Sequence, residues 1–356
     1  MRKVCMALLL ALVGASTASA ATLADTCASA ANAWLASLSE EQRDEAVRPF
    51  DHEGRKKWTN LPGGRYRDEG LPFEDMSENQ RKLAHRLMQC GLSSQGYQKA
   101  VGIMWVDDYL FSKMTNPEMQ AVINRGYGFY WVGVFGEPGG DAPWGWQVDG
   151  HHLGLNFTVA DGMVEVTPAF VGIQPNEIPD GPYTGWRVLG EEEDKALALV
   201  NSLDDMQRSR AILSATVPDE IFTGPERGDA LTDFEGLTGS DMTDGQRALL
   251  QGLIEEYVRN VDPEAADALL GRIAADGADV LHFAWMGPTE AGSPFYYRVH
   301  GPSVLIEFDH TLVIGRAQSG ERQHDPNHIH TILRQPGQDY GADLLRRHYE
   351  EHHADD

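Results

Sequence analysis

The stretch Trp144–Phe157 constrains the fold of this chain more than any other. It holds two tryptophans, two adjacent histidines and an asparagine among small and apolar residues. Asp149-Gly150 lies between two apolar runs, which predicts a β-hairpin with its turn at that dipeptide. Side chains alternate along a strand, so His151 would face the apolar side of the second strand. His152 would lie on the opposite side with Asn156.

The N-terminus predicts a signal peptide over residues 1–20. Arg2 and Lys3 supply the positive end, residues 4–13 the apolar core, and Ala18-Ser19-Ala20 the small-residue cleavage site. The apolar run is too short to cross a bilayer, and no second long apolar run follows it. We therefore expect no membrane span and a periplasmic or secreted protein, cleaved after Ala20.

Two cysteines, Cys27 and Cys90, belong to the expected mature chain. An even pair in an oxidising compartment favours a disulfide. On the chain-entropy model, closing such a long loop stabilises the fold by roughly 4 kcal/mol. Two buried free thiols are the alternative.

The charge is strongly acidic, with 29 Lys and Arg against 54 Asp and Glu and a net charge of −25 at pH 7. This balance argues against nucleic acid and anionic membranes as partners. The sequence contains no Gly-x-Ser-x-Gly elbow, no phosphate loop and no Gly-x-Gly-x-x-Gly motif. After removal of the signal peptide, residues 21–356 fit a single compact domain.

Alternating helical and strand-like segments predict an α+β fold, with antiparallel sheet and flanking helices. Capping boxes begin several of the helices, and their neighbourhoods match in pairs. Ser37–Arg43 resembles Ser202–Arg208, and Asp75–Arg81 resembles Asp241–Arg247, at offsets of 165 and 166 residues. Recurrence of capping boxes through helix physics alone is the alternative to duplication.

We predict two pseudo-repeated halves, about 25–170 and 190–335. The polar, irregular stretch 218–240 is the best candidate for a linker. In this alignment Phe129-Tyr130 corresponds to Phe295-Tyr296. Gly150-His151-His152 corresponds to the segment Asn327–His330.

A second group of histidines lies near the C-terminus, in Asn327-His328-Ile329-His330. Histidines at positions i and i+2 of a strand point to the same side. Two imidazoles on one face with a nearby carboxylate are typical of zinc, iron or copper sites. Glu307 and Asp309 alternate with apolar residues on another predicted strand and are the candidate carboxylates. Of the earlier pair, we expect His152 to complete the site.

Several of these motifs together resemble the bacterial domain of unknown function family 3500. The similarity implies no particular activity, but it supports the choice of motifs. The stretch 310–326 looks longer than is usual in that family. The matching stretches are Trp144–Asn156, Thr167–Phe170, Phe283–Gly287, Tyr296–Pro302, Ile306–Asp309 and His328–Leu345.

Two functions are compatible with these residues. The first is an exported metal-dependent hydrolase or oxidoreductase that acts on a small-molecule or peptide substrate. The second is a non-catalytic ligand- or metal-binding protein that uses its Trp- and Tyr-rich strands as a groove. The predicted metal ligands are His151, His152, His328 and His330, and the predicted catalytic residues are Glu307, Asp309, Arg298 and Tyr296.

Overall fold

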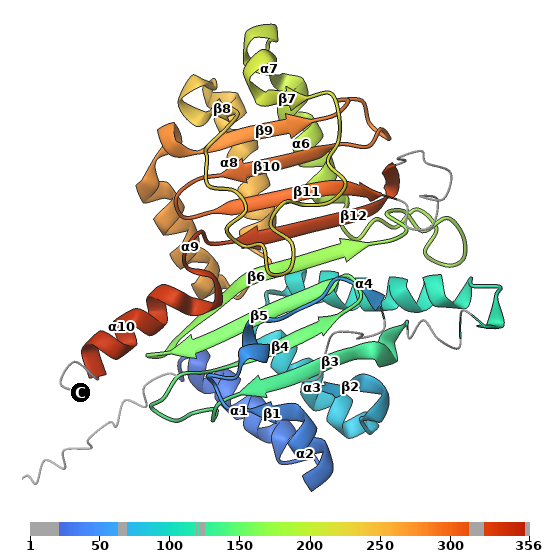
Figure 1. The fold of residues 1–356 in the computed structure, drawn as a ribbon, viewed down its shortest axis with the longest axis vertical. Coiled ribbons are helices and arrows are strands. Elements are labelled where there is room, and N and C mark those ends of the chain that lie inside the picture. Colours follow the sequence, from blue (N-terminus) through green and yellow to red (C-terminus); the bar gives the residue numbers. More distant parts are fainter. Residues whose placement is uncertain (1–20, 63–69, 119, 121–124, 313–323, 353–356) are drawn as a thin grey trace, which may run out of the picture.

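The chain folds around one open β-sheet. The computed structural model describes residues 21–62, 70–118, 120, 125–312 and 324–352. In that part, twelve strands form the sheet in the order β1-β3-β4-β5-β6-β12-β11-β10-β9-β7, with β2 paired to β3 and β8 to β9 (Figure 1). Neighbours are antiparallel except β1 with β3 and β7 with β9. The predicted α+β class is confirmed.

The twelve strands of the described residues vary from two to eleven residues in length. They are β1 (Val47–Arg48), β2 (Leu71–Pro72), β3 (Tyr130–Phe135), β4 (Trp144–Gly150), β5 (Leu153–Ala160), β6 (Met163–Ile173), β7 (Ile212–Ser214), β8 (Leu237–Thr238), β9 (His282–Met286), β10 (Tyr296–His300), β11 (Leu305–Leu312) and β12 (His324–Arg334).

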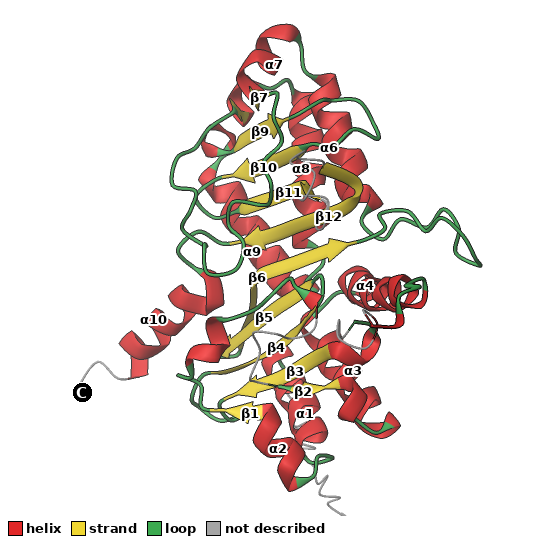
Figure 2. Ribbon diagram, turned by 45° about the vertical axis from the view of Figure 1, so that its right-hand side comes forward, coloured by secondary structure: helices red, strands yellow, loops and turns green. Residues whose placement is uncertain are grey.

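Most helices pack on one face of the sheet, where α6, α8 and α9 lie behind β9 to β12 (Figures 1 and 2). No helix of the described residues combines the length and apolar character needed to cross a membrane. The predicted signal peptide, residues 1–20, lies outside the described residues. The helices are α1 (Leu23–Leu35), α2 (Glu40–Ala46), α3 (Glu78–Gly91), α4 (Ser94–Ser112), α6 (Gly190–Ser202), α7 (Asp205–Ala211), α8 (Asp244–Val258), α9 (Pro263–Asp276) and α10 (Ala342–His352).

The helix-covered face of the sheet is apolar. Trp146 of β4 and Phe157 of β5 stack with ring centroids 4.3 Å apart, and both are buried. The last residue of α3, Gly91, lies directly against them, since a Cβ there would be 2.3 Å from the Phe157 ring. Only glycine lets the end of this helix approach the sheet so closely.

The opposite face carries polar side chains and lies beneath residues 215–236, which we call the covering segment. This segment crosses in front of the C-terminal strands in Figure 1. The main-chain N–H groups of Phe222 and Thr223 donate to Glu307 of β11, and Arg334 of β12 donates to the Thr223 carbonyl. The prediction of a linker over residues 218–240 is therefore wrong, because this backbone satisfies buried polar groups of the sheet.

The strand order is symmetric about the central pair β6–β12. Reading outwards from β6 gives β5, β4, β3 and β1, and reading outwards from β12 gives β11, β10, β9 and β7. Both outermost pairs are parallel, and a two-residue strand joins the side of β3 just as another joins β9. Four helices of each half fit the same order, α1 to α4 and α6 to α9.

The capping glutamines make the same contacts in both halves. Gln42 and Gln80 exchange side-chain hydrogen bonds, and each also donates to a main-chain carbonyl. Gln207 and Gln246 repeat this arrangement. Capping alone requires no contact between the two glutamines, so the shared network favours duplication over independent recurrence. The superposition of the two halves stays a prediction.

The same strand order overturns two predicted correspondences. In this order the turn that carries His151 and His152, between β4 and β5, corresponds to the turn between β10 and β11, whereas the later histidines lie on β12. Similarly, Tyr130 begins β3 but Tyr296 begins β10. The offset changes because the connection from α4 to β3 is longer than that from α9 to β9.

A buried ion network joins the helices of the two halves. Lys99 of α4 lies 2.7 Å from Glu192 of α6 and 2.5 Å from Glu256 of α8. Glu192 is fully buried, and burial raises its pKa against the opposing effect of the Lys99 charge. Such a pair contributes little by itself, but the removal of one partner leaves an uncompensated buried charge.

We expect Lys99→Met to lower the free energy of unfolding by about 3–5 kcal/mol, because Glu192 loses its counter-ion in the interior. Urea denaturation followed by circular dichroism measures the loss. Lys113 and Asp180 form an exposed ion pair and supply the control, since Lys113→Met should change stability by less than about 1 kcal/mol. Equal losses in both variants would contradict the structural role of Lys99.

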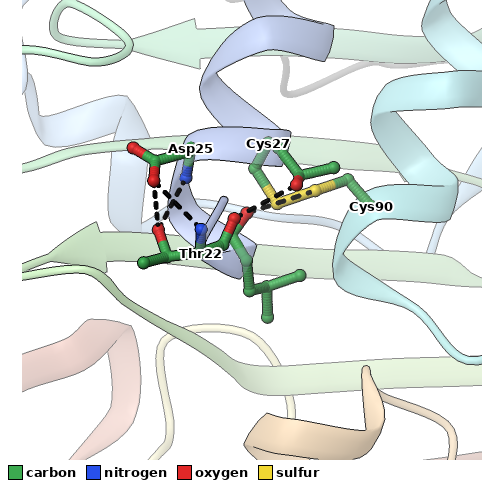
Figure 3. Close-up of a disulfide and its surroundings, with 6 residues drawn as sticks. Thr22, Asp25, Cys27 and Cys90 are labelled. Carbon is green, nitrogen blue, oxygen red and sulfur yellow. Dashed lines mark hydrogen bonds between the residues drawn. A yellow bond between two sulfur atoms is a disulfide. The ribbon is translucent and has the colours of Figure 1, made fainter. Parts of the chain in front are cut away.

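Cys27 of α1 and Cys90 of α3 form a disulfide, as the sequence predicts (Figure 3). The two residues are 63 positions apart and their Cα atoms are 5.3 Å apart. One turn earlier, Thr22 and Asp25 form the capping box that begins α1. The disulfide therefore holds the capped N-terminal end of α1 against α3.

We expect reduction of this disulfide to lower the free energy of unfolding by roughly 4 kcal/mol, because the unfolded chain regains the freedom of a long loop. Denaturation curves with and without reductant measure the change. A Cys27→Ala/Cys90→Ala variant should give the same denaturation curve with and without reductant. Two free thiols in the unfolded, unreduced mature protein would refute the bond.

Candidate metal centre

The turn between β4 and β5 consists of His151 and His152. The ladder pairs Asp149 with Gly154 and Gly150 with Leu153, so β4 continues through the dipeptide that the sequence predicts as the turn. His152 adopts φ 64°, in the left-handed region. The predicted turn position is therefore wrong, and strand alternation does not apply to either histidine, because both are turn residues.

His151 is directed towards helix α4. Its Nδ1 lies 2.6 Å from the Asp107 carboxylate, and its Nε2 lies 3.2 Å from the Arg125 guanidinium. Burial lowers the pKa of His151. Burial alone would raise the pKa of Asp107, but His151, the Gly126 N–H and Arg125 together lower it. Both ring nitrogens of His151 are engaged, so it is poorly placed to be a metal ligand.

His152 turns to the opposite face and meets the two histidines of β12. Its Nε2 lies 2.9 Å from Nε2 of His328. The ring centroids of His152 and His330 are 5.2 Å apart, and those of His328 and His330 are 4.8 Å apart. One nitrogen from each of the three rings lies within 4.8 Å of the others, and none of the three residues is more than 5% exposed. Tetrahedral zinc ligands are separated by roughly 3.3 Å, so small adjustments would close this site.

Gly172 of β6 makes room for these rings. It lies opposite His330 in the β6–β12 ladder, and its N–H donates to the His152 carbonyl at 2.8 Å. A Cβ at this position would lie 3.0 Å from the His330 ring, 3.1 Å from the His152 ring and 2.8 Å from the Ile329 carbonyl. The absence of a side chain at Gly172 therefore lets the two imidazoles come together above β6.

The covering segment supplies a carboxylate to the site. Nδ1 of His330 lies 2.7 Å and 2.9 Å from the two carboxylate oxygens of Glu220. The contact with His330 lowers the pKa of Glu220 although burial alone would raise it. Nε2 of His330 is buried and has no hydrogen-bond partner among the described residues. A carboxylate on Nδ1 leaves Nε2 as the basic nitrogen, which is the arrangement found in metal-bound histidines.

The rings of His152 and His328 are neutral at ordinary pH. Burial lowers the pKa of His152 well below its usual range, and the neighbouring histidines lower it further. Burial, followed by the effects of His330 and His151, lowers the pKa of His328 to about 2. Neutral imidazole is the form that binds a metal ion, so these two rings need not lose an imidazolium proton before they bind one.

The four predicted catalytic residues lie on two adjacent strands, Tyr296 and Arg298 on β10 and Glu307 and Asp309 on β11. Tyr296 donates to Glu307 at 2.8 Å, and Arg298 donates to Glu235 of the covering segment at 2.5 Å. Asp309 lies opposite His330 in the β11–β12 ladder and is fully buried. Of these four, only Asp309 belongs to a potential metal-binding group, with Glu220 and His330.

Another histidine group lies at α10. His348 is 3% exposed and lies 2.7 Å from Asp161, which His352 also approaches. His348 is buried because α10 packs beside the β5–β6 turn. His324 lies at the start of β12.

Sequence reasoning missed Glu220, Asp107, Arg125 and Gly172. Glu220 stands in a segment without strand or helix periodicity, and Asp107 belongs to a long helix whose charged positions resemble solvated ones. No local pattern marks Gly172, because its importance depends on the ring of His330 in the neighbouring strand. The acidic pair Asp219-Glu220 is the sequence feature that could have pointed to Glu220.

The fold and the three rings define an open-sheet α+β protein with a buried three-histidine cluster. The chain matches the family described as "Protein of unknown function (DUF3500)" over residues 20–342, and it therefore belongs to that family. This confirms the resemblance seen in the sequence. No curated protein and no solved structure matches the chain.

The low pKa of His328 predicts an acid-sensitive fold. Between about pH 6.5 and pH 4.5 the unfolded chain takes up a proton at His328 that the folded chain refuses, so stability falls as the pH falls. The metal-free wild type should lose roughly 2–3 kcal/mol more than His328→Gln over this interval. Urea denaturation at both pH values gives the difference, and parallel pH profiles would contradict it.

Proposed function

We propose that the protein is an exported metal-dependent enzyme whose divalent transition metal is held by His152, His328 and His330. The observation that carries this proposal is the convergence of three buried imidazoles. Nε2 of His152 lies 2.9 Å from Nε2 of His328, and Nε2 of His330 has no other partner among the described residues. Three buried imidazoles cannot all satisfy their ring nitrogens through one another, and a buried polar atom without a partner is unfavourable.

The donor set fits zinc, iron or copper, which imidazole ligands suit. Three protein ligands leave a coordination position for water or substrate, as in catalytic zinc sites. A metal bound there would polarise a substrate oxygen or lower the pKa of bound water. Copper or iron would instead support oxygen chemistry, so hydrolase and oxidoreductase both remain within the proposal.

The surrounding residues have defined roles in this proposal. Glu220 accepts from Nδ1 of His330 and holds that ring with Nε2 directed at the site. The ring of His151, held by Asp107, stacks on His152 with centroids 3.8 Å apart and limits its rotation. Tyr296 and Arg298 stay candidate substrate-orienting residues, and Glu307 and Asp309 the candidate acids.

The second candidate is a non-catalytic periplasmic protein that binds a metal or another ligand. The near-complete burial of His152, His328 and His330 favours it, because a substrate needs access to the metal. The disulfide between Cys27 and Cys90 supports export under either function. The two functions differ in whether metal binding brings activity.

Metal binding is tested with chelator-stripped mature protein. We expect Co²⁺ to give the visible absorption of imidazole coordination, and zinc to displace it. His328→Ala should abolish this spectrum, because two imidazoles no longer complete the site. His324→Ala provides the matched control, since His324 also lies on β12 but bonds the His310 carbonyl.

An unchanged cobalt spectrum in His328→Ala would refute the three-histidine centre. If the spectrum is lost as expected, zinc-, iron- and copper-loaded proteins are assayed against ester, peptide and phosphoester substrates and for oxygen consumption. Turnover that depends on the metal and on His328 supports the enzyme. Tight binding without turnover in any of these assays favours the non-catalytic protein.

A further inference from the structure

Two acids of β11 have the same burial but very different surroundings. Glu307 and Asp309 are both 0% exposed and lie on the same side of the strand. Glu307 accepts from the main-chain N–H groups of Phe222 and Thr223 at 2.8 Å, from the Thr223 hydroxyl, and from the Tyr296 hydroxyl. Neither oxygen of Asp309 has a hydrogen-bond partner among the described residues.

Asp309 faces a second carboxylate and an imidazole. One oxygen each from Asp309 and Glu220 and one ring nitrogen of His330 lie within 4.8 Å of one another. Nδ1 of His330 is the nitrogen on this side, since it contacts both oxygens of Glu220. The opposite nitrogen of the same ring is directed at the three-histidine centre. His330 therefore stands between two groups of potential ligands.

Among the described residues, Arg227 acts on Glu220, but no cationic side chain offsets the charge of Asp309. A buried carboxylate without donors is strongly unfavourable unless a proton or a cation neutralises it. Nearby Glu220 adds like-charge repulsion, while Arg298 is engaged with Glu235. Glu307 shows that this fold satisfies a buried acid with N–H and O–H groups where it needs one for structure. At Asp309 the space is surrounded by potential ligands instead.

We propose that Glu220, Asp309 and His330 bind a second divalent cation beside the three-histidine centre, with the His330 ring shared between the two. Two carboxylates and one nitrogen suit manganese, iron or zinc. The incoming cation takes the place of the Nδ1 proton of His330, which is released to solvent. Glu220 is the ligand nearest to solvent, with its side chain 30% exposed, and provides the route of entry. This inference rests on the proposed function, because it shares a ligand with that centre.

The test is metal stoichiometry, measured by calorimetry and elemental analysis after zinc or manganese titration of stripped mature protein. All variants carry His352→Ala, because Asp161, His348 and His352 form a separate group that zinc could occupy. The parent protein, which carries His352→Ala alone, should bind two equivalents of metal. Asp309→Asn should bind one and keep the cobalt spectrum of the three histidines, whereas His152→Ala should lose that spectrum.

Asp309→Asn preserves shape and removes a buried charge, so it should fold, and Glu220→Gln offers a second route to the same answer. Glu307→Gln is the matched control, and it should keep both equivalents because its acid is already satisfied. Two equivalents in Asp309→Asn would overturn the second site, as would loss of both, which would indicate one composite site.

The remaining outcomes separate this inference from the proposed function. One equivalent in the parent, lost in His152→Ala and kept in Asp309→Asn, would leave the three-histidine centre standing and overturn the second site. No bound metal in the parent would overturn both. One proton released per second equivalent, seen in the parent and not in Asp309→Asn, would support the shared His330 ring.

Discussion

The antiparallel pairing of β6 with β12 is the interaction on which the rest of the molecule depends. It joins the two sets of strands into one sheet and places Gly172 opposite His330. Because Gly172 also donates to the carbonyl of His152, the same register brings the β4–β5 turn over β12. A slip of one residue would move His328 and His330 to the helix-covered face and separate them from His152.

The structure also depends on the covering segment, because the buried polar groups on that face of the sheet need hydrogen-bond partners. Without the N–H groups of Thr223 and its neighbour, the buried Glu307 on this face would lose most of its donors and keep the Tyr296 hydroxyl. The same segment brings Glu220 to His330. The chain thus uses an irregular stretch, rather than helices, where the sheet carries acids and imidazoles, and the candidate chemistry lies beneath it.

Local patterns predicted much of the fold. Capping boxes located the starts of helices such as the one at Glu40, because a cap involves residues only three positions apart. The period of two placed His328 and His330 on one side of a strand for the same reason. The predicted hairpin turn is two residues too early. The usual preference of Asp-Gly for turns favours residues 149–150, but the chain turns at His151 and His152, where His152 adopts the left-handed conformation.

The sequence by itself determined the alternation of helices and strands, the pairing of Cys27 with Cys90, and which histidines share a strand. These depend on neighbours in the chain or, for the disulfide, on there being one pair to form. Only the tertiary structure decided that His152 meets His328, 176 positions away, and that Asp309 is left without a donor. Such contacts follow from strand register and from the path of an aperiodic segment, and no short-range pattern encodes either.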